Sequence, residues 1–182
     1  FGPLGFDFTC VRRHGFGALR SEDLSAEFRF EERNGLVKRA DILPDLLQQG
    51  RQIIPVNEDN LAHIFKITEA LDHKEYVCFQ GDRYLNADKL LTCKFMGHEA
   101  HFPIGPFLLA SRMKVPVVFY FAMREAKQTY HFHFILAEQV SGSKEKRAEQ
   151  LLLEQYVNAL EKIISQYPEQ WFNYYSFWKP SE

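Results

Sequence analysis

Three blocks of sequence between residues 75 and 121 decide the fold. They read E-Y-V-C-F-Q-G-D-R-Y at 75–84, K-F-M-G-H-E-A-H-F-P-I-G-P-F-L-L-A at 94–110, and V-P-V-V-F-Y-F at 115–121. Tyr76 to Phe79 and Val115 to Phe121 are short apolar runs without helical spacing, which is typical of buried strands. Because such strands pack inside sheets that helices cover, the blocks indicate a protein with both helices and strands in one domain.

The first block ends in a charged turn. Gly81 ends the apolar run, and Asp82 and Arg83 follow it at the carboxyl end of the predicted strand. Ligand crevices of open α/β sheets form at such edges, and the planar donors of an arginine suit a phosphate or a carboxylate. The turn therefore predicts an anion site made by Gly81, Asp82 and Arg83. The alternative is an ordinary pair of solvated charges.

A strand, a helix and a second strand are predicted from residue 51 to residue 79. The helix spans 57–71, is capped by Asn57 or Asp59, and has Leu61, Ile64, Phe65 and Leu71 on one face. Such a unit predicts a parallel pair of strands with a right-handed crossover, and hence an α/β fold. We expect one sheet with three neighbouring central strands and two covering helices: strands Ile53 to Val56, Tyr76 to Phe79 and Val115 to Phe121, and helices Asp59 to Leu71 and Lys144 to Tyr167.

Further elements follow from local patterns. Residues 91–95 alternate in polarity as a half-exposed strand does, Gly97 permits a turn, and Pro106 suits the first turn of a helix that continues to Arg112. Residues 130–136 alternate as well and predict an antiparallel edge strand. The sequence W-F-N-Y-Y-S-F-W at 171–178 is too aromatic to remain in water, so it is predicted to dock on the body, with lipid or another chain as alternative partners.

Four blocks, in order, resemble the lipid A biosynthesis (lauroyl/myristoyl) acyltransferases, within the wider lysophospholipid and glycerolipid acyltransferase superfamily. They are Gln80-Gly81-Asp82-Arg83, the Phe95 to Ala110 segment, Val115-Pro116-Val117, and Tyr167-Pro168-Glu169-Gln170-Trp171-Phe172. The resemblance covers roughly 53–178 and implies an α/β domain with a mixed central sheet flanked by helices, incomplete at the N-terminal side. It also implies that Gly81 and Arg83 contact the anionic group of an acceptor.

The resemblance implies a reaction and its partners. A fatty acyl group passes from an acyl-carrier-protein or coenzyme A thioester, as co-substrate and without another cofactor, to a phospholipid or lipid A-like acceptor. The family's base is a His followed five positions later by Asp or Glu, ahead of the glycine-arginine block. Five positions after His14, His63 and His73 stand Leu19, Thr68 and Cys78. The catalytic residue is thus unassigned, and we expect lipid binding with poor or no acyl transfer.

The first fifty residues differ in composition from the rest. Arginine predominates over lysine in 1–45, whereas lysine predominates from residue 52 onward. We assign 51–182 to the acyltransferase-like domain and leave 1–50 unassigned. Truncation, an altered reading frame, a replaced segment and simple divergence all remain open for this part.

Composition limits the partners. A formal net charge of -2 without a basic, aromatic-rich run predicts no binding to nucleic acid. The apolar run at 115–123 is far shorter than the roughly 20 residues that span a bilayer.

The three cysteines, Cys10, Cys78 and Cys93, are interpreted as reduced packing residues. Burial would raise the pKa of Cys78 and make its thiol inert. We expect a cytoplasmic protein with peripheral contact to the inner face of the membrane.

Two further functions are alternatives. The chain could be a non-catalytic, lipid-binding remnant of the acyltransferase fold. It could instead bind a metal through two histidine pairs, His98 with His101 and His131 with His133. No third ligand with its own spacing accompanies these pairs, so the sequence predicts no bound metal.

Overall fold

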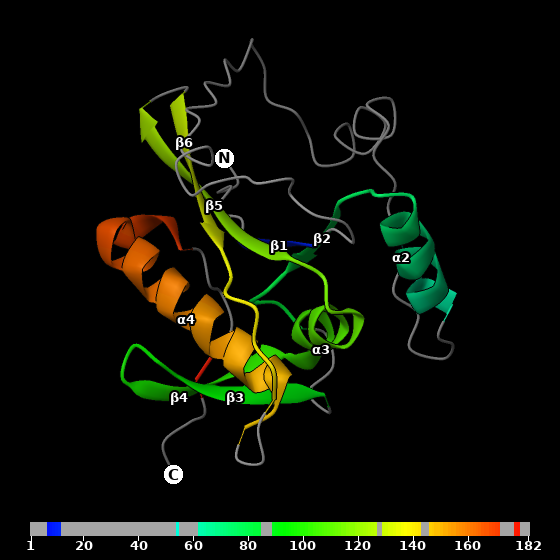
Figure 1. The fold of residues 1–182 in the computed structure, drawn as a ribbon. Helices are drawn as coiled ribbons and strands as arrows, with labels where there is room; N and C mark the ends of the chain where they lie inside the picture. Colours follow the sequence, from blue (N-terminus) through cyan, green and yellow to red (C-terminus); the bar gives the residue numbers. More distant parts are fainter. Residues whose placement is uncertain are drawn as a thin grey trace.

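The computed structural model describes residues 7–11, 54, 62–84, 89–126, 129–142, 146–171 and 177–178, with 7–11, 126, 129 and 130 described as backbone. These residues form an α/β arrangement of two sheets and three α-helices, as the sequence predicts (Figure 1). In chain order the elements are β1 (Asp7–Val11), α2 (Ala62–Asp72), β2 (Val77–Gln80), β3 (Leu90–Phe95), β4 (His98–Pro103), α3 (Ile104–Met113), β5 (Val117–Ala126), β6 (Thr129–Leu136), α4 (Ala148–Gln166) and the 3-10 turn η1 (Pro168–Gln170).

The larger sheet has the strand order β2-β1-β5-β6, and each of its strands pairs antiparallel with its neighbours. Phe8 of β1 lies opposite Gln80 on one side and opposite Tyr120 on the other. Since β2 and β5 are both antiparallel to β1, they run in the same direction. Their carboxyl ends therefore point to the same edge of the sheet.

This topology corrects one part of the sequence prediction. Tyr76 to Phe79 and Val115 to Phe121 do supply strands of the same sheet, but β1 lies between them, so they are not direct neighbours. The third predicted strand, Ile53 to Val56, lies outside the described residues except for Ile54, which is in no strand. The parallel pair that depends on it stays a prediction.

Helix α4 covers one face of the larger sheet and separates it from the second sheet (Figure 1). Its buried stripe includes Leu152, Tyr156, Leu160 and Ile163. The helix begins at Ala148, four residues after the predicted start at 144, and ends at Gln166, two residues before Pro168. The Tyr156 ring is fully buried and packs against Phe102, Phe107, Phe119 and Phe121, so it joins both sheets to the helix.

Strands β3 and β4 form a separate antiparallel hairpin on the other side of α4. Its turn contains Met96 and Gly97, both with positive φ, as expected for the glycine predicted to permit a turn. Side chains of α4 cover the free edge of β3, since Gln150 donates to the Thr92 carbonyl at 2.9 Å and Glu161 accepts from the Met96 amide. The predicted helix that contains Pro106 follows as α3.

The described part of the aromatic tail docks on this hairpin. Phe177 is buried, and Trp178 forms a bridge with Ala100 of β4 and donates its indole N–H to the Phe95 carbonyl at 3.1 Å. Trp171 and Phe177 also pack edge-to-face on the Phe95 ring. Docking on the body, the first of the three predicted alternatives, is therefore confirmed for these residues.

Strand β2 is half-buried, whereas the sequence predicted a buried strand. Val77 is buried, but Cys78 is exposed and Tyr76 is 52% exposed. Side chains of a strand alternate between faces, so one face of β2 packs inward and the other does not. The prediction of an inert Cys78 thiol assumed that this residue is buried. Because Cys78 is exposed, that assumption is wrong.

Helix α2 confirms the predicted helix from residue 62 onward, although its buried face differs. Ile67 and Leu71 are buried four residues apart, while Phe65, placed on the apolar face by the sequence, is 76% exposed. Phe65 follows Ile64 by about 100° around the helix and so leaves the buried stripe. Among the described residues, no helix combines the length and the apolar character needed to cross a membrane.

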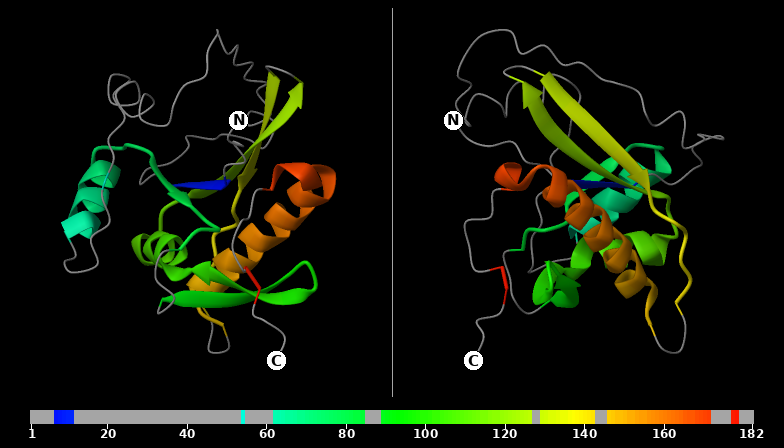
Figure 2. Two further views of the ribbon diagram at one scale, coloured as in Figure 1. Left: turned by 180° about the vertical axis from the view of Figure 1, so that it is seen from behind. Right: turned by 90° about the vertical axis from the view of Figure 1, so that its left-hand side faces the viewer.

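Figure 2 shows the two hairpins from behind and from the side. The β5–β6 hairpin extends at one end of the molecule, and the β3–β4 hairpin lies at the opposite end. Functional side chains carried by β4 and by β6 are therefore kept apart.

Candidate functional site

The predicted anion site lies where β2 ends. Asp82 is buried, with 4% of its surface exposed, and its Oδ1 lies 3.3 Å from Nε of Arg83. The Arg83 side chain is 31% exposed. A buried carboxylate beside a guanidinium holds that side chain in one direction and leaves part of it accessible from solvent. Gly81, Asp82 and Arg83 thus share one turn, and their role in binding an anion stays a prediction.

Gly81 has a packing role that the sequence did not reveal. A Cβ placed on it would lie 2.6 Å from Cζ and 2.9 Å from the hydroxyl oxygen of Tyr156. Such distances are shorter than van der Waals contact, so the close approach of this turn to α4 requires glycine. The turn is therefore seated directly on the centre of the core.

The four histidines considered as metal ligands occupy two different sheets. His98 and His101 are on β4, where His101 Nδ1 lies 3.3 Å from the Thr92 hydroxyl. His131 and His133 are on β6, at the other end of the molecule. Within the described part of the chain, no three His, Cys, Asp or Glu side chains are grouped so that they could hold a metal ion. The structure does not bring the two pairs together.

His131 and His133 instead belong to a cluster at the end of the β5–β6 hairpin. Their rings stack with centroids 4.2 Å apart, and Nδ1 of His131 lies 3.0 Å from Oε1 of Glu125. The Tyr167 hydroxyl donates to the same Glu125 oxygen at 3.3 Å, and the Tyr167 ring packs edge-on against His133. Glu125 and Tyr167 were not predicted to belong to this cluster, because they are 42 residues apart in the chain and no sequence pattern indicates that they meet.

The surroundings of the cluster shift two pKa values. Burial lowers the pKa of His133, and the neighbouring His131 lowers it further, against the opposite effect of Glu125. Burial raises the pKa of Tyr167, and Glu125 adds to the rise. His133 is therefore held in its neutral form, and Tyr167 keeps its proton.

The lowered pKa of His133 predicts a loss of stability in acid. Its pKa in the folded chain is below the ordinary 6.5, so the unfolded chain binds more protons as pH falls through 6.5. We expect the free energy of unfolding to fall from pH 8 toward pH 5, and this fall to be smaller in the His133→Gln variant. Urea denaturation across this range measures both, with His98→Gln as the control that removes an exposed imidazole from β4. Identical pH profiles for wild type and His133→Gln would contradict the assignment.

A cavity of about 370 Å³ lies between β3 and α4. It is lined by polar groups and one thiol, from Thr92, Cys93, Lys94, Gln150, Glu154 and Asn158. Burial and the nearby Glu154 raise the pKa of the Cys93 thiol, so that this cysteine stays protonated, in line with its predicted packing role. A polar lining of this kind does not suit a fatty acyl chain.

These features define an α/β domain in which a glycine, an aspartate and an arginine directly follow a strand, at the edge of its sheet. Residues 46–180 match the family model described as bacterial lipid A biosynthesis acyltransferase. The chain therefore belongs to the lipid A biosynthesis acyltransferase family, which confirms the resemblance found in its sequence. No curated protein and no solved structure matches the chain.

Proposed function

We propose that this domain transfers a fatty acyl group from an acyl-carrier-protein or coenzyme A thioester to a phospholipid or lipid A-like acceptor. Its membership of the family supports acyl transfer in general. The observation that carries the acceptor assignment is the turn after β2, where buried Asp82 lies 3.3 Å from the partly exposed Arg83. In this proposal Arg83 binds an anionic group of the acceptor, and Asp82 orients it.

The donor needs no metal and no other cofactor, since the thioester is itself the activated group. Burial of its acyl chain contributes about 0.8 kcal/mol per methylene, so binding depends on apolar surface. Six described phenylalanines are almost completely buried and pack inside the core: Phe95, Phe102, Phe107, Phe119, Phe121 and Phe177. We therefore place the acyl chain on apolar surface outside this filled core.

The lipid acceptor puts the domain at a membrane surface, and we propose peripheral contact on the cytoplasmic side. Phe65 and Tyr76 are 76% and 52% exposed and stand near the two ends of α2. Aromatic side chains favour the interface between water and lipid. They are the side chains we expect to touch the bilayer.

Replacing Arg83 with alanine should weaken binding to a phosphorylated lipid. A charge-assisted contact of this kind contributes about 1.5–3 kcal/mol, which corresponds to on the order of 10- to 100-fold in affinity. Co-sedimentation with phosphatidylcholine vesicles, with and without phosphatidic acid, measures the phosphate-dependent part. Arg83→Lys should recover part of the binding, because it restores the charge without the planar fork.

Arg112→Ala is the matched control, since Arg112 is exposed in the last turn of α3. If Arg83→Ala and Arg112→Ala bind equally well, the turn after β2 has a structural role alone. Phosphate-dependent binding by a chain that shows no acyl transfer would support the non-catalytic, lipid-binding alternative.

A further inference from the structure

Two of the three cysteines occupy opposite positions in the larger sheet. The register of the antiparallel pair β1–β2 places Cys10 directly opposite Cys78. The two strands come from segments more than sixty residues apart in the chain, so only the folded sheet brings these positions together. Cys78 is exposed to solvent. A pair of cysteines at one position of the ladder, with one of them accessible, is a candidate for oxidation.

The hydrogen bonds of the sheet show which kind of pair this is. Ala137 donates its backbone N–H to the Val117 carbonyl at 2.9 Å, so Val117 is hydrogen-bonded to the β6 side of β5. Because hydrogen-bonded positions alternate along an antiparallel strand, the backbone groups of the next residue, Val118, point to β1. Val118 lies opposite Cys10, so Cys10 directs its own backbone groups to β5. The pair that Cys10 makes with Cys78 on β2 is therefore a non-hydrogen-bonded pair.

Non-hydrogen-bonded pairs are the close pairs of an antiparallel ladder. Their Cα atoms are about 4.5 Å apart, and residues directly opposite each other share a face of the sheet. A disulfide requires Cα atoms about 4.4–6.8 Å apart, with the Cβ atoms turned toward each other. The backbone at Cys10 and Cys78 therefore meets the distance requirement without movement of a strand.

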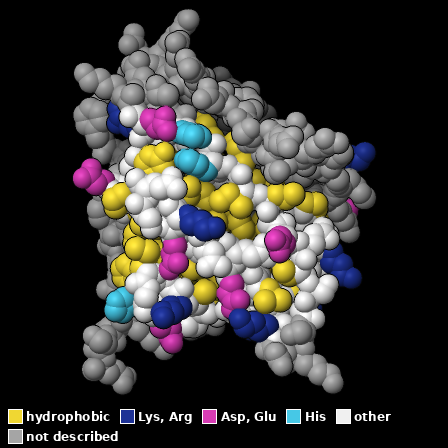
Figure 3. All heavy atoms as spheres, turned by 60° about the vertical axis from the view of Figure 1, so that its left-hand side comes forward, with side chains coloured by type: hydrophobic (Ala, Val, Ile, Leu, Met, Phe, Trp, Pro, Cys, Tyr) yellow, Lys and Arg dark blue, Asp and Glu magenta, His cyan; other side chains and the backbone are white. Residues whose placement is uncertain are grey.

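The histidine cluster of the same sheet does not take part. A neighbouring imidazole is one of the groups that activate a thiol. The stacked histidines are on the β5–β6 hairpin, and Figure 3 shows two adjacent histidine side chains beside an acidic one on the surface. Strand β2 is at the opposite edge of the sheet, with β1 and β5 between it and β6. Oxidation of the cysteine pair thus depends on access to Cys78 and on the register.

Strand β2 depends on β1 for its place in the sheet. In the strand order β2-β1-β5-β6, β1 is the neighbour of β2 within the described residues. β2 leads directly into the turn of Gly81, Asp82 and Arg83. A covalent bond between β1 and β2 would therefore fix the strand that carries this turn.

We propose that Cys10 and Cys78 form a site of reversible oxidation, at which a hydroperoxide converts the two thiols into a disulfide that fastens β1 to β2. The exposed position of Cys78 leaves the bond open to attack by thiols as well. Exposed disulfides are more easily reduced than buried structural ones. A transient, redox-sensing bond is also the kind that occurs in the cytoplasm, where stable disulfides are rare.

The oxidation is balanced in two steps. The Cys78 thiolate attacks one oxygen of hydrogen peroxide, the oxygen–oxygen bond breaks, and the sulfur becomes a sulfenic acid with loss of one water. The Cys10 thiolate then attacks the Cys78 sulfur, the sulfur–oxygen bond breaks, and a second water leaves. Two electrons pass from the two sulfurs to the peroxide. Two molecules of reduced glutathione return these electrons and restore both thiols.

The test treats the whole 182-residue chain with hydrogen peroxide at low protein concentration and counts its thiols under denaturing conditions. We expect the wild type to fall from three free thiols to one. Peptide mapping without reduction should give one linked peptide that contains Cys10 and Cys78. Reduced glutathione should restore the three thiols. The oxidised chain should unfold at a higher urea concentration than the reduced chain, because the disulfide closes a long loop in the unfolded state.

Three variants serve as controls. Cys93→Ser removes the cysteine of the other sheet, and His133→Gln changes the histidine cluster, so both should still form the linked peptide. The double variant Cys78→Ser with Gln80→Cys tests the register, because Gln80 is exposed two residues further along β2. This position is diagonal to Cys10, and diagonal positions are about 7–8 Å apart, beyond the range of a disulfide. The double variant should not form the linked peptide.

Four results would overturn the proposal in whole or in part. If Cys78 stops at the sulfenic acid or links to a second chain while Cys10 keeps its thiol, the two residues do not form a site. Equal linkage in the double variant would show that the register does not select the pair. A bond that resists reduced glutathione would contradict reversibility, and an oxidised chain no more stable than the reduced one would contradict the fastening of β1. These measurements involve neither acyl transfer nor lipid, so they are independent of the proposed function.

Discussion

Replacing Phe95 with alanine is expected to lower the free energy of unfolding by about 3–5 kcal/mol, the usual cost of removing a buried aromatic ring. Phe95 has no exposed surface and stands at the centre of an aromatic cluster. Four rings surround it with centroids 5.2 to 5.9 Å away: Phe102, Trp171, Phe177 and Trp178. Loss of the ring leaves a cavity and removes the surface on which the tail docks.

The two tryptophans of the chain are both in this tail, so their fluorescence reports its docking directly. In Phe95→Ala we expect a red-shifted emission, together with a lower midpoint in urea. Phe65→Ala is the matched control, because this ring is 76% exposed and its removal should change stability by less than about 0.5 kcal/mol. The smallest effects of core substitutions on the free energy of unfolding are on the order of 1 kcal/mol. If Phe95→Ala lowers the free energy of unfolding by no more than this, docking of the tail does not depend on the Phe95 ring.

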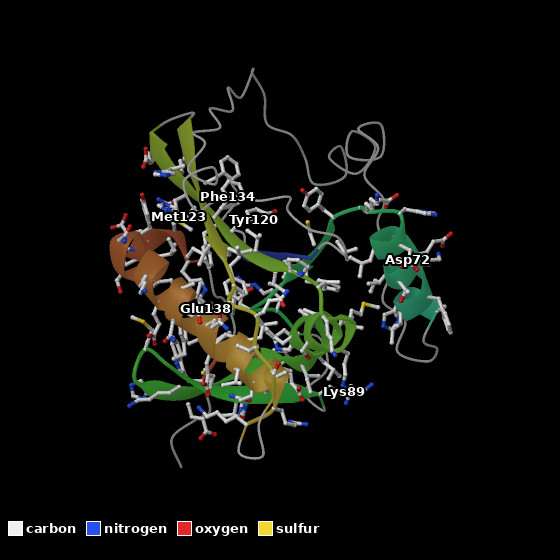
Figure 4. The ribbon with its side chains drawn as sticks, in the orientation of Figure 1. Asp72, Lys89, Tyr120, Met123, Phe134 and Glu138 are labelled. Atoms are coloured by element: carbon white, nitrogen blue, oxygen red, sulfur yellow. The ribbon has the colours of Figure 1, made fainter. Side chains whose placement is uncertain are left out.

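The sequence predicted those strands and helices whose polar and apolar residues recur with the period of the element itself. The alternating residues at 91–95 and at 130–136 lie in β3 and β6, and the helix predicted over 144–167 corresponds to α4, whose apolar residues are buried on one face. In each case, the period of the sequence matches the geometry of the element, so burial follows from the residues themselves. Figure 4 shows a consequence on the sheet, where Tyr120 and Phe134 of paired strands lie together, with centroids 5.9 Å apart.

Pairing could not be predicted in the same way. No pattern in the sequence predicts that Asp7 to Val11 lies between β2 and β5, since this pairing joins segments more than sixty residues apart in the chain. Strand β4 was missed as well. Its residues H-E-A-H-F-P mix exposed and buried side chains, with Ala100 and Phe102 as the buried ones. Pairing partners, not propensity, define both strands.

The same contrast holds for the two sites. Gly81, Asp82 and Arg83 are consecutive, so their proximity is a property of the sequence and the turn was predicted. Glu125 and His131 meet because a hairpin folds back with a bulge at Glu125. The alternation of His131 and His133 was visible in the sequence; it predicted an edge strand, and metal binding was considered for these histidines only as an alternative. The signal that could have identified the pair is the hairpin itself, with an acid before its turn and a histidine after it.

Replacing Gly81 with alanine should destabilise the domain by about 1–3 kcal/mol, as overpacking of a filled core does. The φ angle of Gly81 lies outside the left-handed region, so space and not backbone strain limits the substitution. A Cβ would stand 2.6 Å from Cζ of Tyr156, whose fully buried ring packs against Phe102 of one sheet and Phe119 of the other. The turn itself must then move, and Asp82 and Arg83 move with it.

Gly105→Ala is the matched control, because a Cβ on this glycine of α3 would meet nothing within 4 Å. In a helix this change should be neutral or stabilising by about 0.4–1 kcal/mol. Urea denaturation of both variants measures the difference, and vesicle binding shows whether the displaced Arg83 still meets phosphate. Coupling to the ring is tested by the double variant Gly81→Ala with Tyr156→Leu, which should lose less stability than the sum of the single changes. Additive losses would show that the turn does not press on Tyr156, and that the glycine is required there for another reason.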